Sequence, residues 1–177
     1  HANNANTLLL RAGIYSIALE TLTNIIYEEN KEKINPIPDK KLTIKIQEKF
    51  KEIIQEYDVF ISDYGKQVIE AKINDINKPT NSKKLTKPFE IYGIVLSKSD
   101  IEILNHRNKF LHGSSPFNES QLKEKEKELK YISSKLFYLL NVLILKYCGY
   151  SGHLIDYGSW HQLKWEEKVT EHLFKII

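Results

Sequence analysis

The sequence has a single cysteine, Cys148, and no methionine. One cysteine cannot form a disulfide within the chain, which excludes the small disulfide-stapled scaffolds of secreted proteins. Its neighbours Leu145 and Tyr147 are apolar, so we expect a buried thiol rather than a nucleophile. Because methionine is missing even at position 1, the chain is either a processed product or an excerpt of a longer protein. We favour the excerpt, with an N-terminal sensor domain that is absent from this chain.

Long apolar runs and a dominant charge are also missing. The longest apolar runs, such as residues 136–140, are too short to cross a bilayer, and no basic-then-apolar leader opens the chain. We therefore expect a soluble, cytoplasmic protein with no membrane partner. Its 26 basic and 23 acidic residues leave a net charge of +3, which is not the strong basic excess of a constitutive nucleic-acid coat protein. Any contact with RNA should be local and transient.

Helical periodicity is what the sequence has in abundance. With 177 residues and 41% hydrophobic content, the chain is long enough for a single domain, residues 1–177, with a substantial core. Apolar residues recur at helical spacing in stretches 7–29, 41–73, 97–113, 121–147 and 163–176. The second half of 121–147 is apolar enough to be the central core helix or a dimer face. We predict an all-α fold, an antiparallel bundle of four to five long helices with short extra helices.

Breaks between these stretches follow from proline, glycine and polar residues. Pro36 and Pro38 interrupt the chain after the first helix, and Gly65 is expected to bend or divide the second. Segment 74–88 is rich in asparagine, proline and lysine and predicts a mobile basic loop. Its lysines are either a solvated surface or a group that steers RNA phosphates: Lys83, Lys84 and Lys87. Segment 89–96 is interpreted as a packed connector.

The stretch 97–113 carries the candidate chemistry. Ser97 is followed three residues later by Asp100, a pairing that caps the first turn of a helix, and Gly113 is a favourable helix end. Along this helix, four apolar residues fall on one arc with Arg107 near its middle: Ile103, Leu104, Phe110 and Leu111. A buried unpaired charge costs several kcal/mol. Arg107 must therefore reach solvent, pair with an acid, or line a cleft or a subunit interface.

Two further polar residues border the same arc. Asn108 and His112 are four residues apart and lie one above the other on a helix. On composition alone, a snorkelling Arg107 and a His112 stabilised by the negative end of the helix dipole explain the pattern without any activity. Glu20, on the otherwise apolar first helix, is either a solvent-exposed side chain or the carboxylate that pairs with Arg107.

At these residues the sequence resembles the HEPN superfamily, whose ribonucleases carry arginine, a polar residue, three further residues and then histidine. Here this motif is formed by Arg107, Asn108 and His112, and it is followed by Gly113. Within the superfamily the sequence is most similar to the HEPN domains of ApeA-like bacterial antiphage proteins. The resemblance implies a helical domain that forms a homodimer, with the two motifs facing each other across a shared groove.

The resemblance also implies an activity, metal-independent cleavage of RNA. A 2′-hydroxyl of RNA attacks the adjacent phosphate once a base removes its proton and the developing charge is stabilised. His112 suits acid–base work near neutral pH, Arg107 can hold two phosphate oxygens, and Asn108 would orient either partner. The implied function is an endoribonuclease effector of bacterial antiphage defence or a toxin system. The alternative is a catalytically inactive helical binding or dimerisation module.

Two other classes of site lack their signatures. The six histidines form neither a paired helical spacing nor a cysteine–histidine cluster, so we expect no metal site. Gly149 and Gly152 are not followed by the lysine and hydroxyl residue of a phosphate-binding loop, so nucleotide hydrolysis is not expected. No cofactor is therefore predicted.

Overall fold

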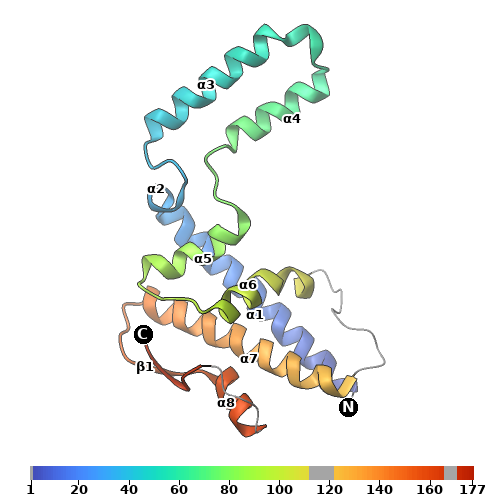
Figure 1. Cartoon of the computed structure of the whole chain (residues 1–177), viewed down its shortest axis with the longest axis vertical. Coiled ribbons are helices and arrows are strands. Elements are labelled where there is room, and N and C mark those ends of the chain that lie inside the picture. Colours follow the sequence, from blue (N-terminus) through green and yellow to red (C-terminus); the bar gives the residue numbers. More distant parts are fainter. Residues whose placement is uncertain (1, 112–121, 166–170) are drawn as a thin grey trace.

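The computed structural model describes residues 2–111, 122–165 and 171–177. Over these residues the protein is mostly helical, 74% helix, with eight helices and a small two-stranded sheet, which confirms the predicted all-α class. In chain order the helices are α1 (Ala2–Glu29), α2 (Lys31–Ile34), α3 (Lys40–Glu56), α4 (Asp63–Asn74), α5 (Asn81–Ile91), α6 (Lys98–Leu111), α7 (Leu122–Tyr147) and α8 (Tyr157–Lys164). A 3₁₀ turn, η1 (Asp58–Phe60), precedes α4. Strand β1 (His153–Ile155) comes before α8 in the chain and strand β2 (Phe174–Ile176) comes after it, and the two strands lie side by side (Figure 1).

The body of the molecule is built around α1 and α7, which pack along each other, while α5 and α6 contact α1 and α8 contacts α7 (Figure 1). The apolar second half of α7 forms the centre of the core, which is one of the two roles predicted for it. The core is formed by side chains that are fully or almost fully buried. From α7 these are Leu136, Leu139 and Leu143, and from α1, α5 and α6 they are Leu19, Ile26, Phe89 and Leu104. Burying apolar side chains between several helices is the main source of stability here.

A helical arm, residues 40–74, projects from this body (Figure 1). The chain between 41 and 73 was predicted to be helical with a break near Gly65, but α3 ends at Glu56 and α4 begins at Asp63. The division lies earlier because Ser62 caps α4 by accepting the Gly65 N–H at 3.1 Å. Gly65 therefore lies in the first turn of α4 rather than at the break.

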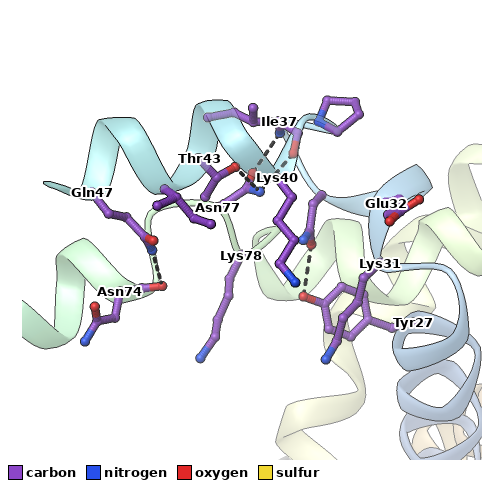
Figure 2. Close-up of a pocket in the computed structure, with 13 residues that line it drawn as sticks. Tyr27, Lys31, Glu32, Ile37, Lys40, Thr43, Gln47, Asn74, Asn77 and Lys78 are labelled. Carbon is purple, nitrogen blue, oxygen red and sulfur yellow. Dashed lines mark hydrogen bonds between the residues drawn. The ribbon is translucent and has the colours of Figure 1, made fainter. Parts of the chain in front are cut away.

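The base of the arm is held by side-chain amides (Figure 2). Asn77 accepts the Ile37 N–H at 2.7 Å and donates to the Ile37 carbonyl at 2.9 Å and to Thr43 Oγ1 at 2.9 Å. Gln47 Nε2 donates to the last carbonyls of α4, Ile73 at 3.2 Å and Asn74 at 3.1 Å. These bonds satisfy the backbone of the proline-containing loop and surround a cavity of about 400 Å³.

Segment 74–88 is not the mobile loop that was predicted, because residues 81–91 form α5. Thr80 caps the helix by accepting the Lys83 N–H at 3.3 Å, and Leu85 and Phe89 anchor it in the core. Pro88 lies inside the helix and is buried. Tertiary packing has outweighed the unfavourable helix propensity of proline.

Residues 92–97 form a packed connector, as predicted for part of segment 89–96. Gly93 has φ +70° and its N–H bonds to the Glu90 carbonyl, which ends α5 and turns the chain. Ile94 and Leu96 then pack against the core.

The C-terminal tail differs from its prediction. A helix over 163–176 was expected, but α8 ends at Lys164 and residues 174–176 form β2, which pairs antiparallel with β1 so that His153 faces Ile176. Asp156 caps α8 by accepting the Gly158 N–H at 3.0 Å and the Ser159 N–H at 3.3 Å. Apolar spacing in the tail was interpreted with the helical period, although its residues 174–176 are extended.

Cys148 is exposed, which contradicts the predicted buried thiol. It lies just after the last residue of α7, and Gly149, with φ +80°, turns the chain away immediately afterwards. Apolar neighbours in sequence do not bury Cys148, because the end of α7 at residues 147–150 is exposed.

A buried ion network ties the tail to the body. Lys135 of α7 is fully buried, and its Nζ lies 2.6 Å from Asp156 Oδ2, 2.9 Å from Glu171 Oε2 and 3.2 Å from Asp100 Oδ1. Lys175 also bonds to Glu171 and lies 3.3 Å from Asp156 Oδ2. Burial alone would lower the pKa of Lys135, but the carboxylates of Asp100, Asp156 and Glu171 outweigh it and raise that pKa.

Candidate functional site

The start of α6 is fixed by the predicted cap. The Ser97 N–H donates to Asp100 Oδ2 at 3.0 Å, and the Asp100 N–H donates to Ser97 Oγ at 3.1 Å. This reciprocal pair is a capping box, which satisfies two backbone donors at once. The side chain of Asp100 is in turn held by Lys135. The rotation of α6, and thus the direction of Arg107, is therefore set by the core of the body.

Arg107 faces α1 and is only 6% exposed. Its Nη2 lies 3.7 Å from Oε1 of Glu20, which is itself partly exposed. Sequence analysis left two alternatives open for Glu20, and both describe it in part, since its carboxylate contacts Arg107 while its side chain is 43% exposed. Ile103 and Leu104, the apolar residues one turn before Arg107 on α6, are buried in the core. Arg107 is therefore a cation buried beside apolar residues, and the negative charge of Glu20 offsets part of the cost of burying it.

The electrostatic environment leaves Arg107 incompletely satisfied. Burial lowers the pKa of the Arg107 guanidinium, while the charge of Glu20 acts in the opposite direction. Within the described part of the chain, Arg107 Nε has no hydrogen-bond partner although it is enclosed. A separation of 3.7 Å from Glu20 is an ion pair without a good hydrogen bond. The guanidinium therefore keeps one enclosed donor, Nε, without a partner among the described residues.

The other two residues of the motif cannot be placed. His112 lies outside the described residues, and so does the side chain of Asn108, although α6 extends to Leu111. Their convergence with Arg107 stays a prediction.

The three candidate RNA-binding lysines lie on the helix α5. Lys84 Nζ lies 4.8 Å from the ring centroid of Tyr27, and Lys87 pairs with Glu90 at 2.6 Å. Of these three lysines, only Lys83 has no side-chain partner among the residues that the structure describes. A direct link that sequence reasoning missed brings α5 to α6, since Ser82 Oγ donates to Asn105 Oδ1 at 2.9 Å. Ser82 therefore ties the first turn of α5 to α6 at Asn105, two residues before Arg107.

The outer face of α1 next to the arginine is apolar and uncovered. Four side chains at helical spacing are between 45% and 65% exposed: Leu10, Ile14, Ile17 and Ile25. We call this set the α1 stripe. Glu20 follows Ile17 by three residues, so the two are neighbours on the helix surface. The α1 stripe therefore borders the pair formed by Glu20 and Arg107.

A comparison with protein-family models, curated proteins and solved structures found no match to this chain. Across residues 2–111, 122–165 and 171–177, no three histidine, cysteine, aspartate or glutamate side chains are grouped so that they could hold a metal ion. None of the described helices is both long and apolar enough to cross a membrane.

Proposed function

We propose that this chain is a metal-independent endoribonuclease that acts in the cytoplasm as the effector domain of a bacterial antiphage defence or toxin system. The observation that carries the proposal is the buried Arg107, which lies in a motif that resembles those of HEPN ribonucleases. Its Nη2 is 3.7 Å from Glu20 Oε1, and its Nε has no hydrogen-bond partner among the described residues. A helical fold with a capped α6 supports the same assignment.

In the proposed reaction His112 removes the proton from a 2′-hydroxyl of RNA. The 2′-oxygen then attacks the adjacent phosphorus, and the bond from phosphorus to the 5′-oxygen breaks. The products are a 2′,3′-cyclic phosphate and a 5′-hydroxyl, whose proton comes from an acid in the site. Arg107 stabilises the charge that develops on the phosphate, and Asn108 orients His112 or the phosphate.

We further propose that two copies pair through the α1 stripe. This arrangement would bury Leu10, Ile14, Ile17 and Ile25, and it would place the two Arg107 residues close to a shared groove. The partial exposure of Glu20 at the border of the stripe supports a groove that is still open to water.

The central test incubates the purified protein with single-stranded RNA in the presence of a chelator. We expect cleavage that leaves a 2′,3′-cyclic phosphate and that is lost in Arg107→Ala and in His112→Ala. His153→Ala is the matched control, because His153 is exposed on β1 and should leave the rate unchanged. Cleavage that survives both motif substitutions, or that requires added magnesium, rules the proposal out.

Pairing is tested by mixing two inactive proteins. A dimer with a composite site would recover activity when Arg107→Ala and His112→Ala chains are combined. The variant Ile14→Glu/Ile17→Glu should sediment as a monomer, since both side chains are more than half exposed and the change should not unfold the body. A native chain that is a monomer and still cleaves RNA would end the dimer proposal.

One observation favours the alternative, a catalytically inactive helical binding or dimerisation module. Arg107 already has a carboxylate within 4 Å, and a buried ion pair of this kind also occurs as a purely structural contact. The Glu20→Gln variant separates the two. A purely structural pair predicts that Glu20→Gln lowers the stability of a chain that cleaves no RNA, whereas a working site predicts RNA cleavage that Glu20→Gln alters.

A further inference from the structure

A second concave site lies on the body where α1, α7 and α8 meet. The cavity is about 240 Å³ and its polar lining side chains are Arg11, Tyr15, Lys130, Ser133, Ser134, Tyr157 and His161. None of the described lining residues is an aspartate or a glutamate. Two cations therefore face a cavity to which the described part of the chain contributes no carboxylate, which favours an anion.

The hydrogen-bonding groups of this cavity are largely unused. Among the described residues, neither Arg11 nor Lys130 forms an ion pair, and the hydroxyls of Ser133 and Ser134 have no hydrogen-bond partner. The Nδ1 atom of His161 is enclosed and also lacks a partner within that part of the chain. Donors that converge on a cavity without protein acceptors are the arrangement that binds phosphate oxygens.

An aromatic cluster adjoins the cavity on α8. His161 stacks on Trp165 at 5.3 Å between ring centroids and meets Trp160 edge-on at 5.1 Å. Lysine ammonium groups lie close to both indoles, Lys130 at 5.8 Å from Trp165 and Lys164 at 5.3 Å from Trp160. Trp160 and Tyr157 are 39% and 46% exposed, so parts of their rings are open to a ligand. Exposed rings among cations are the combination that binds single-stranded nucleic acid.

This site is separate from Arg107. Arg11 and Glu20 are nine residues apart on α1, which is two and a half turns, so they point to opposite sides of the helix. Glu20 is the residue that contacts Arg107. A strand bound at the second site would therefore be held away from the cleavage motif.

We propose that the cavity binds a phosphate group of single-stranded RNA through Arg11 and Lys130, while Tyr157 or Trp160 stacks on a neighbouring base. The choice of RNA rests on the proposed function, whereas the preference for a phosphate rests on the lining itself.

The chain contains a natural reporter, because Trp160 and Trp165 are its two tryptophans and both lie at this site. The experiment titrates the native protein with an eight-nucleotide 2′-O-methyl oligouridine and follows tryptophan fluorescence. That strand has no 2′-hydroxyl nucleophile and so cannot be cleaved by the proposed reaction. AMP and inorganic phosphate are titrated in parallel, to distinguish an RNA strand from a small phosphate ligand.

The key variant is Arg11→Gln/Lys130→Gln, and its matched control is Lys45→Gln/Lys51→Gln, which removes two exposed positive charges from the arm. We expect the key variant to weaken RNA binding roughly tenfold or more and to lower the salt dependence by about one to two phosphate contacts. The control should change the affinity less than twofold. Tyr157→Leu should weaken the binding of the oligonucleotide and leave that of inorganic phosphate unchanged, since phosphate has no base to stack.

Equal RNA affinity and salt dependence in the key variant and its control would overturn the proposal. So would binding of AMP or phosphate without binding of the strand. The outcome is independent of cleavage. If the chain cleaves no RNA but binds the 2′-O-methyl strand through Arg11 and Lys130, the proposed function fails and this site stands. If cleavage depends on Arg107 while the key variant binds RNA normally, the proposed function stands and this site fails. Circular dichroism melting of each variant confirms that it is folded.

Discussion

The body and the arm are both built from helices with apolar residues at helical spacing, yet they bury very different fractions of those apolar side chains. In the body, Leu139 and Leu143 of α7 are almost completely buried among neighbouring helices. In the arm, the apolar face of α3 remains largely open, with Leu42, Phe50 and Ile53 all more than 40% exposed and Thr43 the one buried residue of that helix. Amphipathic spacing predicts a helix, but burial requires more neighbours than a two-helix hairpin provides.

Charged pairs show the same contrast. Lys135 in the body is fully buried among three carboxylates, whereas Lys49 and Glu52 in the arm form a 2.5 Å pair with both side chains more than half exposed. A buried charge that loses its partners is severely destabilising, while an exposed pair contributes little because water already solvates both groups. The stability of the protein should therefore depend on the body and depend little on the arm.

The largest effect should come from Lys135→Met. The substitution leaves Asp100 without its cation and leaves Asp156 and Glu171 with Lys175 alone, so we expect the free energy of unfolding to fall by about 3–5 kcal/mol. Urea unfolding followed by circular dichroism measures the loss. Lys49→Met in the arm is the control and should leave the unfolding midpoint unchanged. Equal effects in the two variants would contradict the contrast between body and arm.

Truncation of apolar side chains should give the next largest difference. Leu143→Ala opens a cavity in the centre of the core and should cost about 2–5 kcal/mol. Ile53→Ala in the arm removes a side chain that is 48% exposed, so the expected cost is below about 1 kcal/mol. The same urea experiment checks both. A costly Ile53→Ala would mean that the apolar face of the arm is covered in solution.

Two glycines near helix starts provide a matched pair. A Cβ at Gly158 of α8 would lie 2.7 Å from Cγ of Lys135, so Gly158→Ala must displace the buried lysine and should cost about 1–3 kcal/mol. At Gly65 of α4, the closest atoms are Ile61 Cγ2 at 3.1 Å and Ser62 Oγ at 3.2 Å, both within the arm. Small shifts there are easier, and the gain in helix propensity partly offsets them, so Gly65→Ala should stay within about 1 kcal/mol. Thermal melting of both variants would show whether this order is correct.

The last prediction concerns how stability depends on pH, and it compares slopes rather than stabilities at neutral pH. Burial raises the pKa of Glu171, yet hydrogen bonds from Lys175, Ser97 and Lys135 outweigh it and hold that pKa well below its usual range. A lowered pKa in the folded state means that the stabilisation is present above the ordinary glutamate range and is lost as the pH falls below about 4. The unfolding free energy of the native protein should therefore decrease on acidification. Glu171→Gln should flatten this decrease, whereas Glu70→Gln, an exposed change in the arm, should not.

Local signals in the sequence predicted much of this structure, and long-range ones did not. The cap formed by Ser97 and Asp100 depends on residues three positions apart, and the core role of α7 depends on its own apolar spacing, so both were predicted correctly. Pro88 favours a loop in the sequence, but the burial of Leu85 and Phe89 holds α5 together in spite of it. The partners of Lys135 lie 21 to 36 residues away in sequence, and no spacing rule identifies them.

The candidate sites divide in the same way. The sequence left two alternatives for Glu20, exposure to solvent or contact with Arg107. In the fold Glu20 makes the contact and stays partly exposed. The cavity lined by Arg11, Lys130 and His161 was not predicted, since it draws one cation from α1, one from α7 and its imidazole from α8. The aromatic residues of the tail were the one signal that could have pointed to it. His112 stays a prediction, because it lies outside the described residues.

The burial of Lys135 also has a use at the bench. Reagents that acylate amines reach lysines through water, and the ammonium of Lys135 has no access to it in the folded chain. Its modification therefore requires the body to open, while exposed lysines such as Lys51 and Lys83 react in the native state. A timed acylation experiment can be read by peptide mass spectrometry in one sample. Modification of Lys135 would report the rate of global opening, and modification of Lys51 and Lys83 would report the native surface.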